Sequence, residues 1–233
     1  MILKIARIKN KFDNQLVVYA NGQPKYILTQ RDGNSFVLSD FNKNICLFTS
    51  HDATVSLTGI IPLWLVGGES KTHSYNLLDA NNSTAGKFHK SVRFMKNKYV
   101  VNLGGMNLDF YARSYDMTRN VFIHKNSVQI AEVVIPLSIT NGFWCYIYLL
   151  DEYSGLEQTL SLLAVHTSLI NPLGGGVSQL AGARVYTSHT RDGYSKLHDS
   201  DWIVRNFNVE DVNAINNEIA ENRKLADSII RKR

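Results

Sequence analysis

The sequence predicts a mainly β protein, in which an antiparallel sandwich or barrel is followed by one apolar helix and a C-terminal amphipathic helix. Short apolar strands separated by turns that contain Asn, Asp and Gly fill residues 1–151. The stretch LEQTLSLLAVHTSLI (156–170) is apolar on nearly every helical face, and residues 209–233 carry a single apolar stripe. Strands that recur at short, regular spacing with such turns are typical of sandwiches and barrels.

The strand-rich region consists of successive hairpins. Residues 16–20 lead through Asn21-Gly22 into residues 24–28, and Asn-Gly is a strong signal for a two-residue hairpin turn. Asn and Asp tolerate the left-handed backbone that tight turns require. Further turns are predicted at residues 40–44, 79–84, 96–98 and 125–127. No helical pattern alternates with these strands, so a parallel Rossmann-type sheet is not predicted.

Residues 156–170 are predicted to form a buried helix. Ser154 fits the N-cap position and Glu157 follows three residues later, which is the spacing of a capping box. A helix that is apolar on nearly every face needs neighbours on all sides. Asn171-Pro172 should end it, because the residue before a proline disfavours helical backbone.

The last sixty residues are predicted to contain a second helix. Residues 173–176 are interpreted as a flexible connection, and residues 183–187 as a short strand. Asn208 should cap a helix that starts at Val209, with acidic residues in its first turn and basic residues at its end. The apolar stripe of this helix consists of Val212, Ile215, Ile219, Ala226 and Ile230. We expect it to dock on the chain's own barrel or on a second copy.

Composition narrows the class of protein. The 233 residues are 44% hydrophobic and 19% charged, with a net charge of +5, so the chain should fold and favour anionic partners weakly. Its two cysteines, Cys46 and Cys145, lie in apolar strands and predict reduced, buried thiols rather than a disulfide framework. The first residues lack the apolar core of a signal peptide. No apolar run approaches the roughly 20 residues of a membrane-spanning helix, so a cytoplasmic location without a transmembrane segment is expected.

The order of these elements resembles a known superfamily. The resemblance is carried by the hairpins around VVYANGQPKY, LSDFNKNICLF and LLDANNSTAGKFH, and by the end piece FWCYIYLLDEYSGLEQTLSLLAVH. This layout is similar to the tubby C-terminal-like superfamily, which includes LURP-one-related proteins and phospholipid scramblases. Over residues 1–170 the resemblance implies a closed antiparallel β-barrel around a central hydrophobic helix. Residues 171–233 then form a C-terminal extension with a helix at 209–231.

The resemblance implies binding rather than catalysis. Tubby-like domains bind phosphoinositides, and scramblase-like members act at membranes. The superfamily brings no catalytic residues and no cofactor to this chain, and we expect none. The function predicted is therefore a non-enzymatic module, at the periphery of a membrane or bound to a protein partner.

A basic segment is the candidate for anion binding. Between Lys71 and Lys125 the chain has nine Lys or Arg and three acids. Clustered positive charge attracts anionic lipid, although a solvated barrel exterior has the same composition. The candidate residues are Lys87, Lys90, Arg93, Lys96 and Lys98. Nucleic acid is a weaker candidate partner, because no base-stacking motif accompanies these residues.

A His/Asp cluster supports the alternative, a metal-dependent hydrolase. The segment SHTRDGYSKLHDSDW contains five residues of types that bind divalent metals. They are His189, Asp192, His198, Asp199 and Asp201. Their spacing matches no known metal motif, and the ordinary interpretation of such a segment is a turn. His166 lies among apolar residues, which favours a packed core histidine over a catalytic base.

Overall fold

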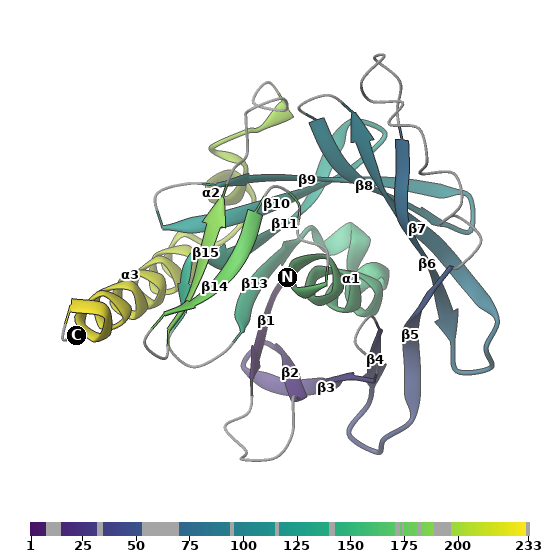
Figure 1. The fold of residues 1–233 in the computed structure, drawn as a ribbon, viewed down its shortest axis with the longest axis horizontal. Coiled ribbons are helices and arrows are strands. Elements are labelled where there is room, and N and C mark those ends of the chain that lie inside the picture. Colours follow the sequence, from purple (N-terminus) through teal and green to yellow (C-terminus); the bar gives the residue numbers. More distant parts are fainter. Residues whose placement is uncertain are drawn as a thin grey trace.

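The computed structural model describes residues 1–7, 15–31, 35–52, 70–93, 96–114, 117–139, 143–170, 173, 175–180, 183–188 and 197–231. Within these residues, twelve antiparallel strands close into a barrel, as predicted (Figure 1). Along the chain they are β1 (Ile2–Arg7), β2 (Gln15–Ala20), β3 (Gln23–Gln30), β4 (Phe36–Ser39), β5 (Ile45–His51), β6 (Ser70–Asp79), β7 (Thr84–Arg93), β8 (Lys96–Leu103), β9 (Met106–Ser114), β10 (Thr118–Lys125), β11 (Val128–Pro136) and β13 (Trp144–Leu149).

The barrel closes where its first strand meets its last. Neighbouring strands are consecutive from β1 to β11, and β13 lies between β11 and β1. Strand β1 pairs with β13 in the register Ile5↔Cys145 and with β2 in the register Ile5↔Val18. Leu3 and Ile5 are fully buried while their neighbours are partly exposed, so β1 has one core face and one outer face.

Two of the predicted turns share one hydrogen-bonding scheme. The Asp40 carboxylate accepts a hydrogen bond from the backbone N–H of Asn44 at 2.8 Å, and Asp79 accepts one from Ser83 at 2.9 Å. Lys43 and Asn82, at equivalent positions, adopt positive φ angles of 66° and 61°. The hydrogen bonds from Asn44 lower the pKa of Asp40.

The turn predicted at residues 96–98 is wrong. Strand β8 already begins at Lys96, and Lys96 pairs with Arg93 of β7. Residues 94–95, which connect these strands, lie outside the described residues. Lys98 lies within β8, where it pairs with Ser91 of β7. Its ammonium forms an ion pair with Asp109 of the next strand, β9, at 2.9 Å.

The predicted apolar helix is present as α1 (Glu157–Leu169) and is buried along its length. Leu160, Leu162 and Leu163 have no exposed surface. The helix contacts the neighbouring strands β4 and β5 and also β13, which is separated from β4 by β3, β2 and β1. Figure 1 shows α1 close to end-on among these strands. Burial on all sides explains why no polar face is found in its sequence.

The capping box predicted for this helix is wrong. Residues Asp151–Leu156 form a 3₁₀-helix, so α1 begins after Leu156 and no side chain caps it. Glu157 is buried, and its carboxylate forms an ion pair with Lys25 of β3 at 2.6 Å. Glu157 is the first residue of the helix and not its third, so the position that a capping box needs is not available to it.

The residues after α1 form a second, smaller sheet. Strands β12 (Ser138–Ile139), β15 (Ala183–Ser188) and β14 (Gly175–Leu180) pair in that order. The strand at 183–187 is thus confirmed, whereas the flexible connection predicted over residues 173–176 is wrong at Gly175 and Gly176. These two glycines pair with Ser188 and Thr187 of β15.

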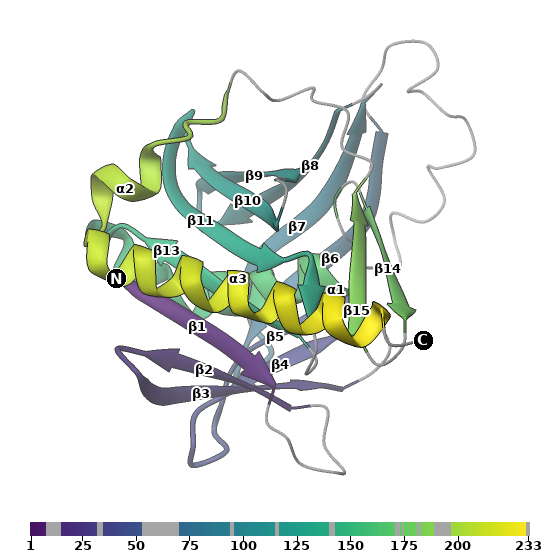
Figure 2. The same cartoon turned by 90° about the vertical axis from the view of Figure 1, so that its left-hand side faces the viewer.

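Two helices complete the chain. Helix α2 (Trp202–Asn206) precedes α3 (Val209–Arg231), which lies on the outside of the barrel along β1 and β13 (Figure 2). Asn208 caps α3 as predicted, since its side-chain oxygen accepts a hydrogen bond from the N–H of Glu210 at 2.7 Å. The stripe residues Val212, Ile215, Ile219 and Ala226 are buried against the chain itself. The side chain of Ile230 lies outside the described residues.

Crossing a bilayer would need a helix that is both long and apolar, and none of the described helices meets both conditions.

The burial of α1 predicts a large cost for a charge at its centre. Leu163→Asp should destabilise the fold by more than about 4 kcal/mol, because an unpaired carboxylate would be desolvated. The control is Leu225→Asp, at a half-exposed position of α3, which should change stability by less than about 1 kcal/mol. Thermal unfolding followed by circular dichroism measures both. Cooperative unfolding of Leu163→Asp near the wild-type midpoint would contradict this packing.

Candidate functional site: a groove along the C-terminal helix

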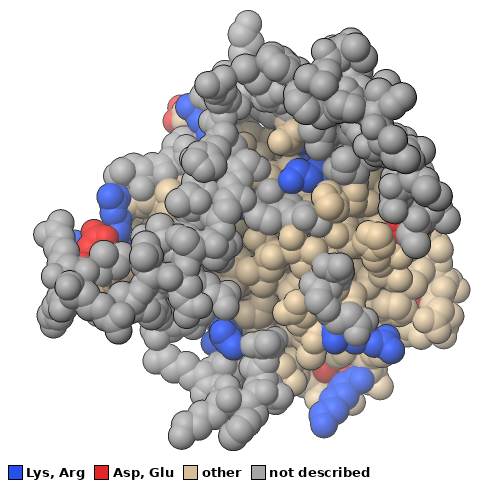
Figure 3. All heavy atoms as spheres, viewed as in Figure 1, with Lys and Arg blue, Asp and Glu red and all other residues tan. Residues whose placement is uncertain are grey.

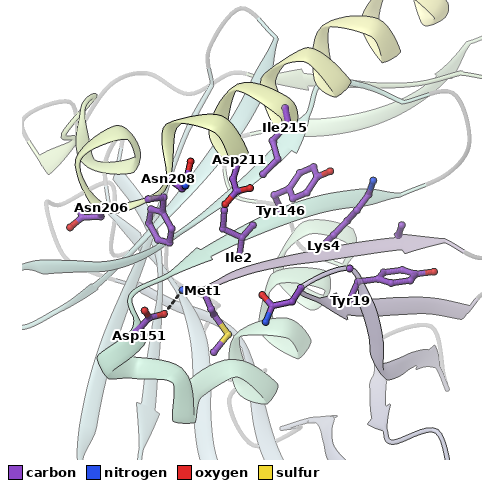
Figure 4. A pocket seen from close by; sticks show the side chains of 15 residues that line it. Met1, Ile2, Lys4, Tyr19, Tyr146, Asp151, Asn206, Asn208, Asp211 and Ile215 are labelled. Carbon is purple, nitrogen blue, oxygen red and sulfur yellow. Dashed lines mark hydrogen bonds and ion pairs between the residues drawn. The ribbon is translucent and has the colours of Figure 1, made fainter.

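An open groove runs between α3 and the outer face of the barrel (Figure 4). We call it the α3 groove. Its main part has a volume of about 990 Å³. It is lined by Met1, Ile2, Lys4, Ala6, Tyr19, Asn21, Gly22, Tyr146, Asp151, Asn206, Phe207, Asn208, Asp211, Ala214 and Ile215. These residues come from three parts of the chain: residues 1–22, Tyr146 with Asp151, and residues 206–215. The closure of the barrel brings the first two parts together.

The side-chain periodicity of β1 and of α3 shows which residues form the floor and which form the wall of the groove. Ile2, Lys4 and Ala6 alternate with the buried residues of β1, so all three lie on its outer face. Asp211, Ala214 and Ile215 are three and four residues apart on α3 and therefore share one helical face. The strand supplies the floor, and the helix supplies one wall.

A charged cluster anchors α3 to this floor. The Lys4 ammonium forms an ion pair with Glu218 of α3 at 2.5 Å. The Tyr146 hydroxyl donates a hydrogen bond to the other carboxylate oxygen of Glu218. Lys4 and Tyr146 are direct cross-strand partners, and the ammonium lies 5.3 Å from the centre of the Tyr146 ring. Burial, followed by the contact with Glu218, raises the pKa of Tyr146.

The groove continues on the other side of this anchor. A second hollow of about 360 Å³ is lined by Lys4, Ala6, Arg7, Phe143, Trp144, Glu218, Glu221, Asn222 and Leu225. It shares Lys4 and Ala6 with the main part, so the two hollows follow α3 in sequence. Leu225, exposed to 50%, is an apolar residue at its rim.

Both signs of charge are present at the opposite end of the groove. The terminal ammonium of Met1 donates hydrogen bonds to the Leu149 carbonyl at 2.7 Å and to the Asp151 carboxylate at 2.5 Å (Figure 4). Asp211 lies in the first turn of α3, where the helix dipole favours a carboxylate. The groove therefore offers apolar contact, amides, a phenol and both charges, which suits noncovalent recognition.

The sequence analysis did not identify this groove. The period-two pattern of β1 and the stripe of α3 predict two half-buried elements, but the sequence shows no sign that they are neighbours. Lys4 and Glu218 are 214 residues apart. Only the closed barrel brings these residues together.

The predicted basic residues do not lie on one face. Lys87 is exposed on the outside of β7. Lys90 lies on the opposite face, which it shares with Phe88, and its cross-strand partner Tyr99 is fully buried. Burial, together with the positive charge of Arg119, lowers the pKa of Lys90.

Lys98 shares the outer face with Lys87, but its ammonium is engaged. It forms an ion pair with Asp109 at 2.9 Å and lies 5.9 Å from the centre of the Tyr111 ring. The side chains of Arg93 and Lys96 lie outside the described residues. On the face drawn in Figure 3, the described basic residues form separate spots rather than one continuous patch.

The members of the predicted metal cluster that can be placed have other contacts. The ring of His198 packs on Phe122 at 5.0 Å. Arg205 forms an ion pair with Asp199, and Asp201 accepts a hydrogen bond from Ser200 at 3.2 Å. His189 and Asp192 lie outside the described residues. Within the part of the chain that is described, no three His, Cys, Asp or Glu side chains converge as metal ligands.

His166 is a core residue, as predicted. It has no exposed surface, and its Nδ1 lies 3.1 Å from the hydroxyl oxygen of Thr49. The rings of Tyr75 and Phe88 pack edge-on against it at 4.3 and 4.9 Å. Burial lowers the pKa of His166 to about 3.

The cysteines differ from each other. Cys145 is fully buried as predicted, and burial raises the pKa of its thiol. Cys46 is only half-buried, because its strand β5 begins at an exposed turn. Burial also raises the pKa of Cys46.

Comparison of the chain with protein-family models, curated proteins and solved structures gives no match.

The environment of His166 predicts acid sensitivity. Unfolded histidine has a pKa near 6.5, so between pH 6.5 and about 3 the unfolded chain binds a proton that the folded chain does not. The free energy of unfolding should therefore fall as the pH falls, by up to about 1.4 kcal/mol per pH unit from this group. His166→Gln should remove that part of the slope in urea denaturation at pH 7, 6, 5 and 4. The exposed His51→Gln is the control, and equal slopes in all three proteins would refute the assignment.

The anchor of α3 predicts a smaller effect. Glu218→Ala should lower the free energy of unfolding by about 1 kcal/mol, because Lys4 and Glu218 are both about one third exposed or more. Glu221→Ala, at an exposed position on the same helix, should change it by less than about 0.5 kcal/mol. Urea denaturation at pH 7 measures both. Equal stability of the two variants would show that the anchor contributes nothing.

Proposed function

We propose that the chain is a non-enzymatic binding module built on a tubby-like barrel, with α1 as its central helix. Two features support this assignment: the closed antiparallel barrel, and the burial of α1 against strands that are separated around it. The contacts of His166 support it further, since they come from β6 and β7 on one side of the helix.

The partner we propose is a segment of another protein, bound in the α3 groove. The observation that carries this proposal is that two hollows with shared lining residues follow one long helix, over the partly exposed outer face of β1. Small-molecule sites are mostly enclosed pockets that bury the ligand. An open groove whose floor and wall carry apolar residues, amides and charges instead matches the way peptides are bound.

The charges favour a protein segment over an anionic membrane. Of the five predicted anion-binding residues, Lys87 is exposed, Lys90 faces inward and Lys98 is paired with Asp109. The α3 groove, in contrast, carries charged residues of both signs, among them Lys4, Asp151 and Asp211. Such a mixture matches a protein surface better than an anionic membrane. Anionic lipid remains the second candidate partner, through the exposed Lys87. The side chains of Arg93 and Lys96 lie outside the described residues.

A metal-dependent hydrolase built on residues 189–201 is still the alternative function, and no cofactor is proposed. A cytoplasmic location, with peripheral contact to a membrane, is part of the proposal. A homo-oligomer through α3 would have to use residues outside the stripe, because the described stripe residues pack on the chain's own barrel.

Peptide selection tests the proposed groove. Peptides from a random displayed library are selected on the whole chain, and their Kd values are measured by fluorescence polarisation. Ala214→Arg places a long side chain in the groove and should weaken binding at least tenfold. Asn213→Arg is the matched control, because Asn213 is an exposed neighbour on α3 that does not line the groove.

Two results would contradict this function. One is a set of selected peptides that bind wild type and Ala214→Arg equally. The other is the absence of any selected peptide, combined with binding to phosphatidylserine vesicles that decreases with salt and in Lys87→Gln. That combination would favour the anionic membrane as the partner.

A further inference from the structure

The outer face of β10 and β11 is buried, although it lies on the outside of the barrel. In β10 every residue from Arg119 to His124 is buried, and in β11 every residue from Gln129 to Pro136. The C-terminal extension contributes to this cover. His198 packs on Phe122, and Phe207 packs on Tyr148 of β13 at 5.1 Å.

A carboxylate lies within this buried face without an ion pair. Glu132 of β11 is 2% exposed. Its two oxygens accept hydrogen bonds from the side-chain amides of Asn120 at 2.6 Å and Gln129 at 2.9 Å. Within the described residues no Lys, Arg or His forms an ion pair with it. Two neutral donors compensate only part of the cost of removing a carboxylate from water.

The two amides also have unused acceptors. Asn120 is 8% exposed and Gln129 is 7% exposed. Their oxygens, Oδ1 and Oε1, are buried and have no hydrogen-bond partner. A buried polar atom that stays unpaired costs about 1–3 kcal/mol. The cluster therefore contains a carboxylate without an ion pair among the described residues and two amide oxygens without a donor. His124, the cross-strand neighbour of Gln129, is also buried, and neither of its ring nitrogens has a hydrogen-bond partner there.

Aromatic rings surround the carboxylate. Phe122 and Tyr148 are its direct cross-strand neighbours, on β10 and β13. Both are almost completely buried. Burial raises the pKa of Glu132, the two amide hydrogen bonds lower it, and the charge of Asp199, which is paired with Arg205, raises it least. The surroundings thus favour a positive charge that can contact the face of a ring.

We propose that Glu132, Asn120 and Gln129 form a binding site for a primary alkylammonium ion. An ammonium has three N–H donors and no acceptor, which corresponds to one carboxylate and two amide oxygens. Its single positive charge neutralises Glu132, and its alkyl part suits Phe122 and Tyr148. A calcium ion fits less well, because it takes six to eight oxygen ligands. This site lies apart from the α3 groove and goes beyond the function proposed for it.

The ammonium could belong to a free amine or to a lysine side chain of a protein. Both share the chemistry that the site recognises, and the experiment separates them. The probes are n-butylammonium and Nα-acetyl-lysine-N-methylamide. Tetramethylammonium carries the same charge without N–H donors, and calcium chloride represents a metal ion.

The measurement is the Tm of the whole chain at pH 7.5 and constant ionic strength. Either primary amine should raise the Tm in a saturable way, by about 3 °C at tenfold excess over Kd. Glu132→Gln should abolish the shift. Glu152→Gln, at an exposed carboxylate, should keep it. If the lysine derivative binds at least tenfold more tightly than n-butylammonium, the natural ligand is a lysine side chain of a protein. If the two bind equally, the natural ligand is a free amine.

The probe series keeps the test decisive even if Glu132→Gln does not fold. An equal shift with tetramethylammonium would overturn the proposal, because the N–H donors would then be irrelevant. A shift with calcium alone would overturn it in favour of a metal site. No shift with either primary amine in the wild-type protein would also overturn it, leaving a protonated Glu132 as the explanation of its burial.

Discussion

The pairing of β1 with β13 is the interaction on which the rest of this structure depends. It closes the barrel and brings the first residues of the chain beside residues 144–149. The same pairing places Lys4 opposite Tyr146, and together they hold Glu218 of α3. The barrel closure, the position of α3 and the α3 groove are therefore linked. A change of register by one residue would turn Lys4 into the core and remove all three.

Two buried polar side chains of this protein, His166 and Glu132, differ in how their neighbours satisfy them. His166 has no exposed surface, one hydrogen-bonding partner in Thr49 and two rings against its own, so it stays neutral. Glu132 is buried to a similar degree but accepts hydrogen bonds from two amides that retain unpaired oxygens. The first group carries no charge, although its Nε2 is buried without a hydrogen-bond partner among the described residues. The second leaves a charge and two acceptors for a ligand, which is why we assign it a binding role.

The position of the extension matters for both proposed sites. Residues 197–207 help to cover the outer face of β10, β11 and β13, and α3 forms a wall of the groove. Trp202, Val212 and Ile215 belong to the same apolar cluster as the barrel residues. The extension thus packs as part of the barrel's outer layer. It forms a wall of the α3 groove, and it helps to cover the barrel face on which Glu132 lies.

Local patterns were sufficient for most elements of this fold. The Asn21-Gly22 hairpin, the helix with no polar face and the Asn208 cap depend on residues close together in sequence, and all three were predicted. The capping box at Glu157 failed because residues 151–156 form a 3₁₀-helix and α1 begins only at Glu157, whose carboxylate pairs with Lys25, 132 residues away. Gly175 and Gly176 were misassigned because β15 pairs with them. The α3 groove was decided only by tertiary structure, since its charge pairs join residues about 150 to 214 positions apart, and such pairs leave no periodicity in the sequence.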